Sequence, residues 1–279
     1  MAGAQIGKTI RINDDEFFML TEYLRTHFGI DLRKKRSLIE GRMNGYLVNR
    51  GFSGYQSYLK ALYEDKTGNE LGKILDYLTT NYSYFMREQE HFRYLESEIL
   101  PQMRERVHDR DLRVWSAGCS TGEEPYTIAM ILSEFFHGES PAWDTRVLAT
   151  DISKRALDHA KRGVYDANAM QTVPARWRLN CFDRLPDGAF QAKEWLRDEV
   201  IFRRLNLIQD SFAFKKKFHV IFCRNVMIYF EAKTKEILME RLYDATEPGG
   251  YLIIGQSESM VRAPGGYSYV MPSIYRKDV

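Results

Sequence analysis

Apolar residues in the first third of the chain recur every three to four positions, which is typical of amphipathic helices. In residues 13–28 they follow this spacing, and Asn13 or Asp14 is placed to serve as the N-cap. Three further helical patterns follow, RSLIEGRMNGYLVNRG, GYQSYLKALYED and ELGKILDYLTTN, without a long strand. The pattern therefore predicts a helical N-terminal domain over residues 1–93.

From Leu112 onward the pattern changes to short apolar runs rich in Val and Ile, LRVWSAG, RVLATDIS, FHVIFCRN and YLIIGQSES. Helical stretches separate them, and strands that alternate with helices indicate βαβ units around a largely parallel sheet. We expect an α/β domain over residues 111–279, joined to the first by a linker over 94–110. Ligands of such sheets bind beyond the carboxyl ends of the strands.

One segment breaks this alternation. It carries a Pro-Asp-Gly turn at residues 186–188 between short alternating runs, which is typical of an antiparallel hairpin. We therefore expect a small antiparallel β-subdomain over about residues 172–203, inserted before the next parallel strand.

Composition narrows the class of protein. The 279 residues are 44% hydrophobic and 28% charged, as in globular proteins, and a net charge of +2 does not predict nucleic-acid binding. Three widely spaced cysteines without a C-x-x-C motif argue against a disulfide framework and a zinc site, so no metal is expected. No signal peptide or run of about 18 apolar residues is evident, so we expect a cytoplasmic protein without membrane insertion.

The loop in VWSAGCSTGEEPYTIAM suits an unusual ligand. Gly118 and Gly122 are separated by three residues, whereas a P-loop has four and then Lys. Glu123 and Glu124 follow instead, and their charges repel phosphate. S-adenosylmethionine, a phosphate-free adenosine with a sulfonium cation, fits, and Gly118 would let the backbone approach it closely. The alternative is a helix start whose acids favour the helix dipole.

Polar residues also follow two other predicted strands. Asp151 ends RVLATD, where a carboxylate can accept hydrogen bonds from both ribose hydroxyls. Its alternative role is a helix N-cap, for which Ser153 competes. Arg224 and Asn225 end the strand in FHVIFCRN, and side chains at that position can face the same crevice.

Taken together, TTNYSYFMRE, WSAGCSTGEEPYTIAM, ATDIS, FCRNVMIYF and GQSES resemble the CheR-type chemotaxis receptor methyltransferases from about Asp15 to the C-terminus. The resemblance implies a Rossmann-like S-adenosylmethionine-dependent methyltransferase domain with a small antiparallel β-subdomain, preceded by an all-α domain. It also implies the reaction: methylation of glutamate side chains on the cytoplasmic helices of bacterial chemoreceptors, with S-adenosylhomocysteine as product.

The resemblance assigns site residues by motif position. Tyr229 matches the active-site tyrosine of the family, and Ser83 and Met86 stand where the family more often has Thr and Phe. Arg87 is the candidate to hold the incoming carboxylate, because a guanidinium grips a carboxylate through two parallel hydrogen bonds. The cofactor contacts fall on Asn81, Ser83, Arg87, Glu124, Asp151, Asn206, Leu207, Arg224 and Asn225.

The segment between Asp31 and Arg50 is locally basic, with six basic residues against two acidic ones. A charge run is usually a solvated helix face. Given the resemblance, it would instead dock on the glutamate-rich receptor helices, with Arg36 and Arg42 as candidate docking residues. The compact FDRLPDGAFQ lacks the insertion of family members that bind a receptor C-terminal pentapeptide, so no dependence on that pentapeptide is expected.

Two other functions stay open. One is a methyltransferase that acts on another carboxylate substrate, and the other is a non-catalytic module that binds S-adenosylmethionine. Arg87 and Tyr229 favour catalysis. The lack of a long basic face studded with aromatic residues argues against a nucleic-acid substrate.

Overall fold

The computed structural model describes residues 10–65, 69–78, 83–208, 212–258 and 266–279. Contacts divide the chain into two compact units, the first comprising Met1–Thr80 with Tyr229–Glu231 and the second Asn81–Ile228 with Ala232–Val279. The division thus falls at residue 80, whereas the sequence predicted a domain end at residue 93 and a linker over 94–110.

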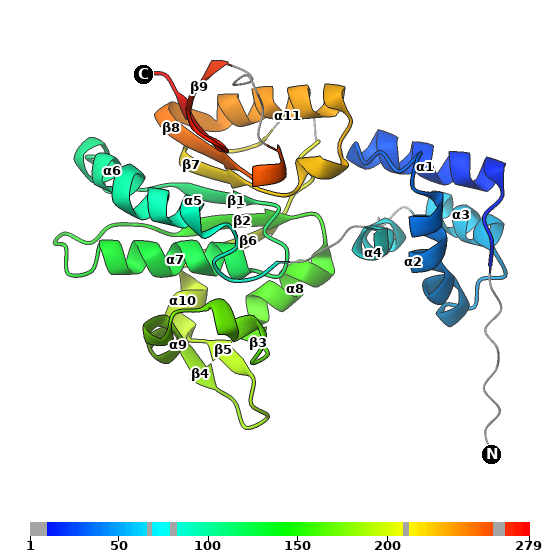
Figure 1. Ribbon diagram of the computed structural model, residues 1–279, viewed down its shortest axis with the longest axis horizontal. Coiled ribbons are helices and arrows are strands. Elements are labelled where there is room, and N and C mark those ends of the chain that lie inside the picture. The colour runs from blue at the N-terminus through cyan, green and yellow to red at the C-terminus, as the bar shows by residue number, and fades with distance from the viewer. Residues whose placement is uncertain (1–9, 66–68, 79–82, 209–211, 259–265) are drawn as a thin grey trace. The chain divides into compact units, whose positions relative to one another are not determined.

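The first unit is helical in its described residues, as expected (Figure 1). Asn13 is the N-cap of its first helix, in a capping box with Glu16 that satisfies two main-chain N–H groups. That helix ends at Gly29, whose φ of 66° is left-handed and therefore suits glycine. The helices are α1 (Asp14–Phe28), α2 (Arg36–Asn49), α3 (Tyr55–Glu64) and α4 (Asn69–Leu78).

The expected linker is helical and carries part of the second unit's core. Residues 89–106 form α5 (Gln89–Tyr94), the π-helical turn η1 (Leu95–Ile99) and α6 (Leu100–Arg106). Leu95, Ile99, Leu100 and Met103 are buried in the same hydrophobic cluster as the strands. Their spacing is that of a helix face, so this stretch belongs with the sheet that it covers.

The second unit is built on a seven-stranded sheet in the order β6-β2-β1-β7-β8-β10-β9. The first five strands of this order are parallel, and β10 and β9 are antiparallel. The four predicted strands are all present, and their carboxyl ends meet at one edge. The strands are β1 (Val114–Ala117), β2 (Val147–Asp151), β6 (Val200–Arg204), β7 (Phe218–Cys223), β8 (Thr246–Ile254), β9 (Tyr267–Met271) and β10 (Ile274–Lys277).

A separate three-stranded antiparallel sheet confirms the small β-subdomain, although its limits differ from 172–203. It begins earlier, at β3 (Val164–Tyr165), and continues with β4 (Phe182–Arg184) and β5 (Phe190–Ala192). The Pro-Asp-Gly turn joins β4 to β5. The run at 200–204 instead pairs in parallel with β2, because its apolar residues extend the large sheet.

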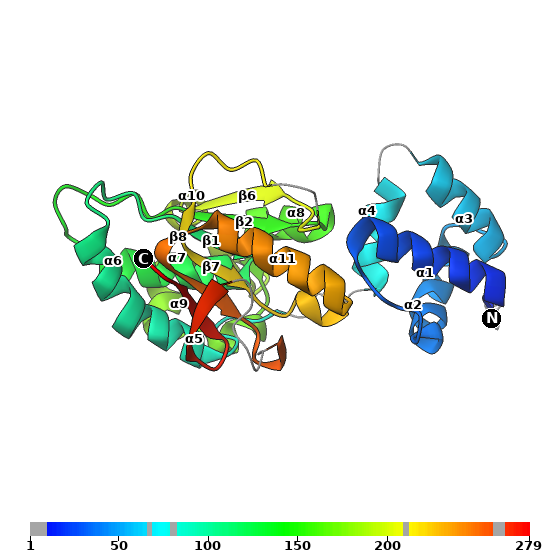
Figure 2. The ribbon, with the colours of Figure 1, turned by 90° about the horizontal axis from the view of Figure 1, so that it is seen from above.

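Helices cover both faces of the large sheet, and Figures 1 and 2 show α7 and α11 on opposite faces. This layering explains why strand residues such as those of β1 are buried throughout. The remaining elements are α7 (Glu123–Phe135), α8 (Lys154–Arg162), η2 (Ala169–Thr172), α9 (Ala175–Cys181), α10 (Glu194–Asp198), η3 (Met227–Tyr229), α11 (Ala232–Ala245) and η4 (Gln256–Glu258).

In the described part of the chain, no helix has the length and apolar character needed to cross a membrane. Nor do His, Cys, Asp and Glu residues group there in a way that could hold a metal ion. Cys119, Cys181 and Cys223 are buried and free.

Candidate active site

The loop between β1 and α7 brings its backbone close to the next loops. Gly118 has a φ of +87°, and a Cβ at this position would lie 2.3 Å from Cγ2 of Val226. Gly122, at φ +98°, likewise leaves no room for a Cβ beside Ala160. Both positions therefore require glycine. The main-chain N–H of Gly118 donates to the carbonyl of Thr150 at 2.8 Å, which fixes the loop beside the end of β2.

Asp151 ends β2 and faces this loop. Its Oδ2 accepts a hydrogen bond from the main-chain N–H of Ser120 at 2.8 Å, and its Oδ1 accepts one from that of Ser153, also at 2.8 Å. Ser153, not Asp151, caps helix α8, since its side chain accepts from the N–H of Ala156. The capping role proposed as the alternative for Asp151 is thus filled by its neighbour.

Glu124 and Arg224, predicted separately, form an ion pair of 2.9 Å. The side chain of Arg224 is 2% exposed, and its Nη2 also lies 3.2 Å from Oε2 of Glu88. Ser116 Oγ donates to the other oxygen of Glu124 at 2.7 Å. One guanidinium thus lies between two carboxylates, and removing one partner of such a buried pair costs about 3–5 kcal/mol.

The net charge of the cluster of Glu88, Glu124 and Arg224 depends on the protonation state of a neighbouring histidine. His91 is buried beside the cluster, and burial, followed by the charge of Arg224, lowers the pKa of His91 to about 4. The imidazole is therefore neutral at pH 7. Among Glu88, Glu124, Arg224 and His91, one negative charge remains, and this balance favours a cationic ligand.

Arg87 lies in the turn just before α5. Its main-chain carbonyl accepts a hydrogen bond from Nη2 of Arg224, and its guanidinium lies 6.0 Å from the ring centroid of Tyr84. Ser83 is half-buried at the start of this segment. The structure thus connects Arg87 to the cluster through the main chain. Asn81 lies outside the described residues.

A second buried carboxylate, that of Glu258, holds the loop after β7. It accepts hydrogen bonds from the main-chain N–H groups of Asn225 (2.7 Å), Ile228 (3.1 Å) and Gly255 (2.9 Å). Burial raises its pKa above the usual value, although these N–H groups oppose the shift. The carboxylate therefore fixes Asn225, which has a left-handed φ of 59°.

The remaining predicted site residues, Asn206, Leu207 and Tyr229, lie after strands β6 and β7. Asn206 and Leu207 follow β6 at the same edge of the sheet, where Oδ1 of Asn206 accepts from the N–H of Ile208 at 3.0 Å. Tyr229 ends η3 and belongs to the first unit by its contacts, but its side chain lies outside the described part of the structure. Parallel topology thus gathers the residues after β1, β2, β6 and β7.

The two candidate docking arginines make contacts within the first unit. Nη1 of Arg36 donates to the carbonyl of Ile12 at 3.0 Å, and its guanidinium lies 4.6 Å from the ring centroid of Phe17. Nη1 of Arg42 donates to the carbonyl of Leu78, the last residue of α4, at 2.8 Å. Both arginines therefore stabilise the helical fold, while the side chain of Arg36 stays 38% exposed.

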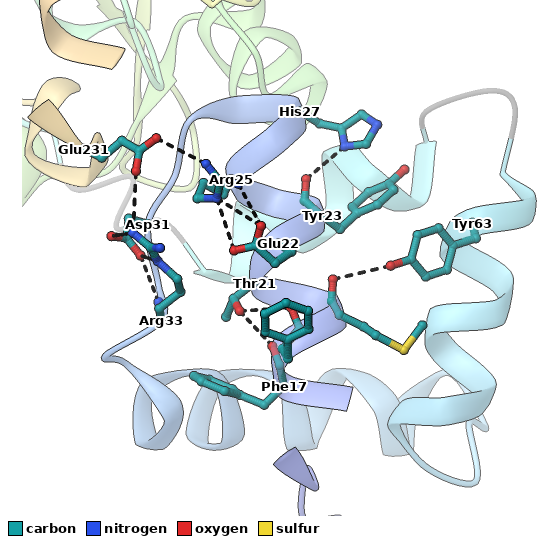
Figure 3. Close-up of polar contacts among 12 residues, drawn as sticks. Phe17, Thr21, Glu22, Tyr23, Arg25, His27, Asp31, Arg33, Tyr63 and Glu231 are labelled. Carbon is teal, nitrogen blue, oxygen red and sulfur yellow. Dashed lines mark hydrogen bonds and ion pairs between the residues drawn. The ribbon is translucent and has the colours of Figure 1, made fainter. Parts of the chain in front are cut away.

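The first unit also includes a short segment next to Tyr229. Ile30 pairs with Phe230 in an isolated antiparallel bridge. Glu231 lies between two arginines, 3.4 Å from Arg25 Nη1 and 3.5 Å from Arg33 Nη2 (Figure 3). The helical unit thus holds the residues that follow the candidate active-site tyrosine.

Comparison with known proteins decides the family. A family profile described as "CheR methyltransferase, SAM binding domain" matches residues 81–274, and "CheR methyltransferase, all-alpha domain" matches residues 15–79. The chain belongs to the CheR methyltransferase family. It is a methyltransferase with S-adenosylmethionine as its cofactor. Both family boundaries fall beside residue 80, where the contacts also divide the chain.

Two relatives match the chain along nearly its whole length. A chemotaxis protein methyltransferase of Borreliella burgdorferi is 40% identical over 274 residues, which cover 96% of each chain. Chemotaxis protein methyltransferase 1 of Pseudomonas aeruginosa is 34% identical over 269 residues, or 94% of this chain and 97% of that one.

The site fits the cofactor of the family in two respects. Gly118 is half-buried in the loop after β1 and has no side chain, so a ligand can approach its exposed main-chain atoms. The cluster of Glu88, Glu124 and Arg224 keeps an excess negative charge, which suits a sulfonium and not a phosphate. Asp151, on the next strand, carries carboxylate oxygens that accept further hydrogen bonds.

Sequence reasoning missed four residues that build this site: Glu88, His91, Ser116 and Glu258. Glu88 and Glu258 lie in the motifs TTNYSYFMRE and GQSES, so the sequence places both residues near the predicted site. It does not predict their contacts, because these join distant positions: Glu88 and Arg224 are 136 positions apart in the chain.

Proposed function

We propose that this chain transfers the methyl group of S-adenosylmethionine to glutamate side chains of bacterial chemoreceptors, forming the methyl esters of chemotactic adaptation. One observation carries the proposal: the turn bearing Arg87 is bonded through its main chain to the cluster of Arg224 and Glu124 in the cofactor-binding domain. The side chain proposed to bind the substrate carboxylate therefore starts beside residues proposed to hold the cofactor. The printed names of the relatives support the assignment to chemotaxis.

The residues present suffice for this reaction. When bound, S-adenosylmethionine supplies an electrophilic methyl group on a cationic sulfur. A glutamate with a pKa of about 4.3 is already ionised at neutral pH, so the chain need not supply a general base. Arg87 would orient the substrate carboxylate through two parallel hydrogen bonds, and orientation with exclusion of water supplies the rate enhancement. Tyr229 is the second candidate catalytic residue, because it matches the active-site tyrosine of the family.

The proposal is tested by incubating receptor fragments with labelled cofactor and measuring base-labile methanol. Wild-type protein should release labelled methanol, and Arg87→Ala should lower the rate at least about 100-fold while the protein stays folded. Arg87→Lys keeps the charge but not the planar fork, so it should restore little activity. Arg93→Ala, in the exposed part of α5, is the matched control. Wild-type protein that releases no methanol would refute the function, and full activity of Arg87→Ala would refute the role of Arg87.

Docking of the receptor is proposed for the basic segment of the first unit, through Arg36 and Arg42. Because both also stabilise the fold, the informative measurement is the salt dependence of the KM for the receptor fragment. Arg36→Ala should raise the KM and weaken its dependence on ionic strength. Arg146→Ala removes an exposed arginine of the second unit and should change neither quantity. A KM that is insensitive to salt in the wild type would contradict electrostatic docking.

The proposed enzyme does not depend on a receptor C-terminal pentapeptide. The hairpin of β4 and β5 supports this, since its turn is closed by hydrogen bonds between Leu185 and Ala189 (2.8 Å) and between Gly188 and Leu185 (3.0 Å). Receptor fragments with and without their last five residues should therefore be methylated equally well. Measurable binding of the isolated pentapeptide would overturn this part of the proposal.

A further inference from the structure

Two residues with left-handed backbone flank Arg87. Met86 has a φ of 62° and Glu88 a φ of 56°. This conformation is unfavourable for residues that carry a Cβ, and it persists where surrounding contacts impose it. The turn that bears Arg87 is therefore held by groups from outside the turn.

Glu88 is the N-cap of helix α5, but its side chain does not cap the helix. An N-cap residue normally has an extended backbone and accepts a hydrogen bond from the second or third N–H of the helix. Glu88 is left-handed and makes no such bond. Its Oε2 lies 3.3 Å from Nδ1 of His91 in the same helix, but the hydrogen bonds of its carboxylate come from other elements.

The carboxylate of Glu88 instead contacts residues of two distant loops. Its Oε1 accepts from Nδ2 of Asn225 at 3.2 Å. Its Oε2 accepts from the main-chain N–H of Gln256 at 3.2 Å and lies 3.2 Å from Nη2 of Arg224. The side chain is 13% exposed, and its burial favours the neutral form. Arg224 and the hydrogen bond from Asn225 outweigh this effect and hold the pKa of Glu88 below its usual value, so the group is charged at neutral pH.

We propose that Glu88 is a positioning residue that fixes the turn bearing Arg87 against Arg224 and Asn225. It acts on both parts of the site. Its contacts with Arg224 and Asn225 shape the cofactor pocket. Because it is the residue next to Arg87, it also fixes the position of the Arg87 main chain, from which the guanidinium extends. Arg224 contacts the same turn directly, because its Nη2 donates a hydrogen bond to the main-chain carbonyl of Arg87. The effect on Arg87 rests on the proposed function, whereas the effect on the cofactor pocket does not depend on the substrate.

The test compares Glu88→Gln with a matched control, Glu90→Gln, in the full-length protein. Glutamine keeps the size of the side chain but loses its charge and replaces one acceptor oxygen with a donor. Glu90 lies two residues further on, in the exposed first turn of α5. Binding of S-adenosylhomocysteine is measured by calorimetry. Turnover is measured on receptor fragments and expressed per molecule competent to bind, using the calorimetric stoichiometry.

We expect Glu88→Gln to raise the dissociation constant at least about tenfold and to lower turnover at saturating substrate at least about tenfold. Glu90→Gln should change both quantities by less than about twofold. A Glu88→Gln protein with wild-type affinity and turnover would overturn the proposal. A lower melting temperature with both quantities unchanged would also overturn it, because that result describes a structural role only.

If Glu88→Gln does not fold, Glu88→Asp decides the question. Aspartate keeps the charge but is shorter by one methylene, so a folded protein with weakened binding and turnover supports positioning. If neither variant folds, the proposal is wrong and Glu88 is a folding residue. Wild-type protein that fails to methylate receptor fragments would refute the proposed function, while the binding comparison would still decide the role of Glu88.

Discussion

Gly118→Ala introduces a methyl group at the closest contact of the cofactor loop. The new Cβ would lie 2.3 Å from Cγ2 of Val226, whereas carbon atoms pack at about 3.5–4.0 Å. The φ of +87° adds a conformational cost of about 1–2 kcal/mol for a residue with a Cβ. Displacing Val226 in a packed loop costs about another 1–3 kcal/mol. The expected loss of stability is thus about 2–5 kcal/mol, a large part of the total for an ordinary domain.

Tryptophan fluorescence can measure this loss for the second unit alone. All four tryptophans of the chain, at positions 115, 143, 177 and 195, belong to that unit. Urea titrations monitored by their emission therefore report its unfolding without a signal from the helical unit. A shift of the midpoint at constant slope gives the change in the free energy of unfolding.

Two comparison variants separate the two costs. Gly138 also has a positive φ, +78°, but a Cβ there meets nothing within 4 Å, so Gly138→Ala should cost only about 1–2 kcal/mol. Val226→Ala removes the colliding Cγ2. In a protein that carries Val226→Ala, Gly118→Ala should therefore lower the free energy of unfolding by about as little as Gly138→Ala does. The reasoning is refuted if Gly118→Ala costs no more than Gly138→Ala, or if Val226→Ala gives no relief.

Three further predictions concern binding, pH and activity. Asp151→Ala should weaken cofactor binding at least about tenfold by calorimetry, whereas Asp158→Ala, which removes a side chain that is 45% exposed on α8, should not. Burial and then Arg113 lower the pKa of His219 to about 4, so the stability of the second unit should fall as the pH drops from about 6.5 through about 4, and His219→Gln should weaken that dependence, to which His91 contributes in the same direction. Glu231→Gln should cost the first unit less than about 1 kcal/mol, yet lower receptor methylation with unchanged cofactor affinity, because its ion pairs hold the segment after the candidate active-site tyrosine.

The sheet could be predicted because its interior strands are buried on both faces. Such strands read as continuous apolar runs, and polar residues at their ends mark the ligand-binding edge. The same reasoning placed Asp151 and Arg224 at one edge of one sheet. The strand at 200–204 was assigned to the small subdomain because it follows the Pro-Asp-Gly turn in a segment of short alternating runs. Its last two residues are arginines, and it forms the edge of the large sheet. A half-exposed edge strand lacks the apolar signal of an interior one.

Side-chain partners were less predictable than elements. The arginines at 36 and 42 read as a charged surface, yet both donate to main-chain carbonyls of the helical unit. Glu88 reads as an ordinary helix-start acid, since acids are favoured there by the helix dipole. Its left-handed backbone and its bonds to residues 224, 225 and 256 depend on tertiary structure. A residue that contradicts its local role marks a functional or strained position, and sequence pattern alone does not reveal the contradiction.

In the proposed reaction one site accepts a cationic cofactor and an anionic substrate, and the contacts of its two arginines differ accordingly. Arg224 is buried between Glu88 and Glu124, so its charge is neutralised locally and the excess is negative, which favours the sulfonium. Arg87 joins that network through its main-chain carbonyl, which accepts a hydrogen bond from Arg224. We propose that its guanidinium receives the substrate carboxylate. Under this proposal Arg224 does not compete with Arg87 for the substrate carboxylate, because the two acids around it already pair with its guanidinium.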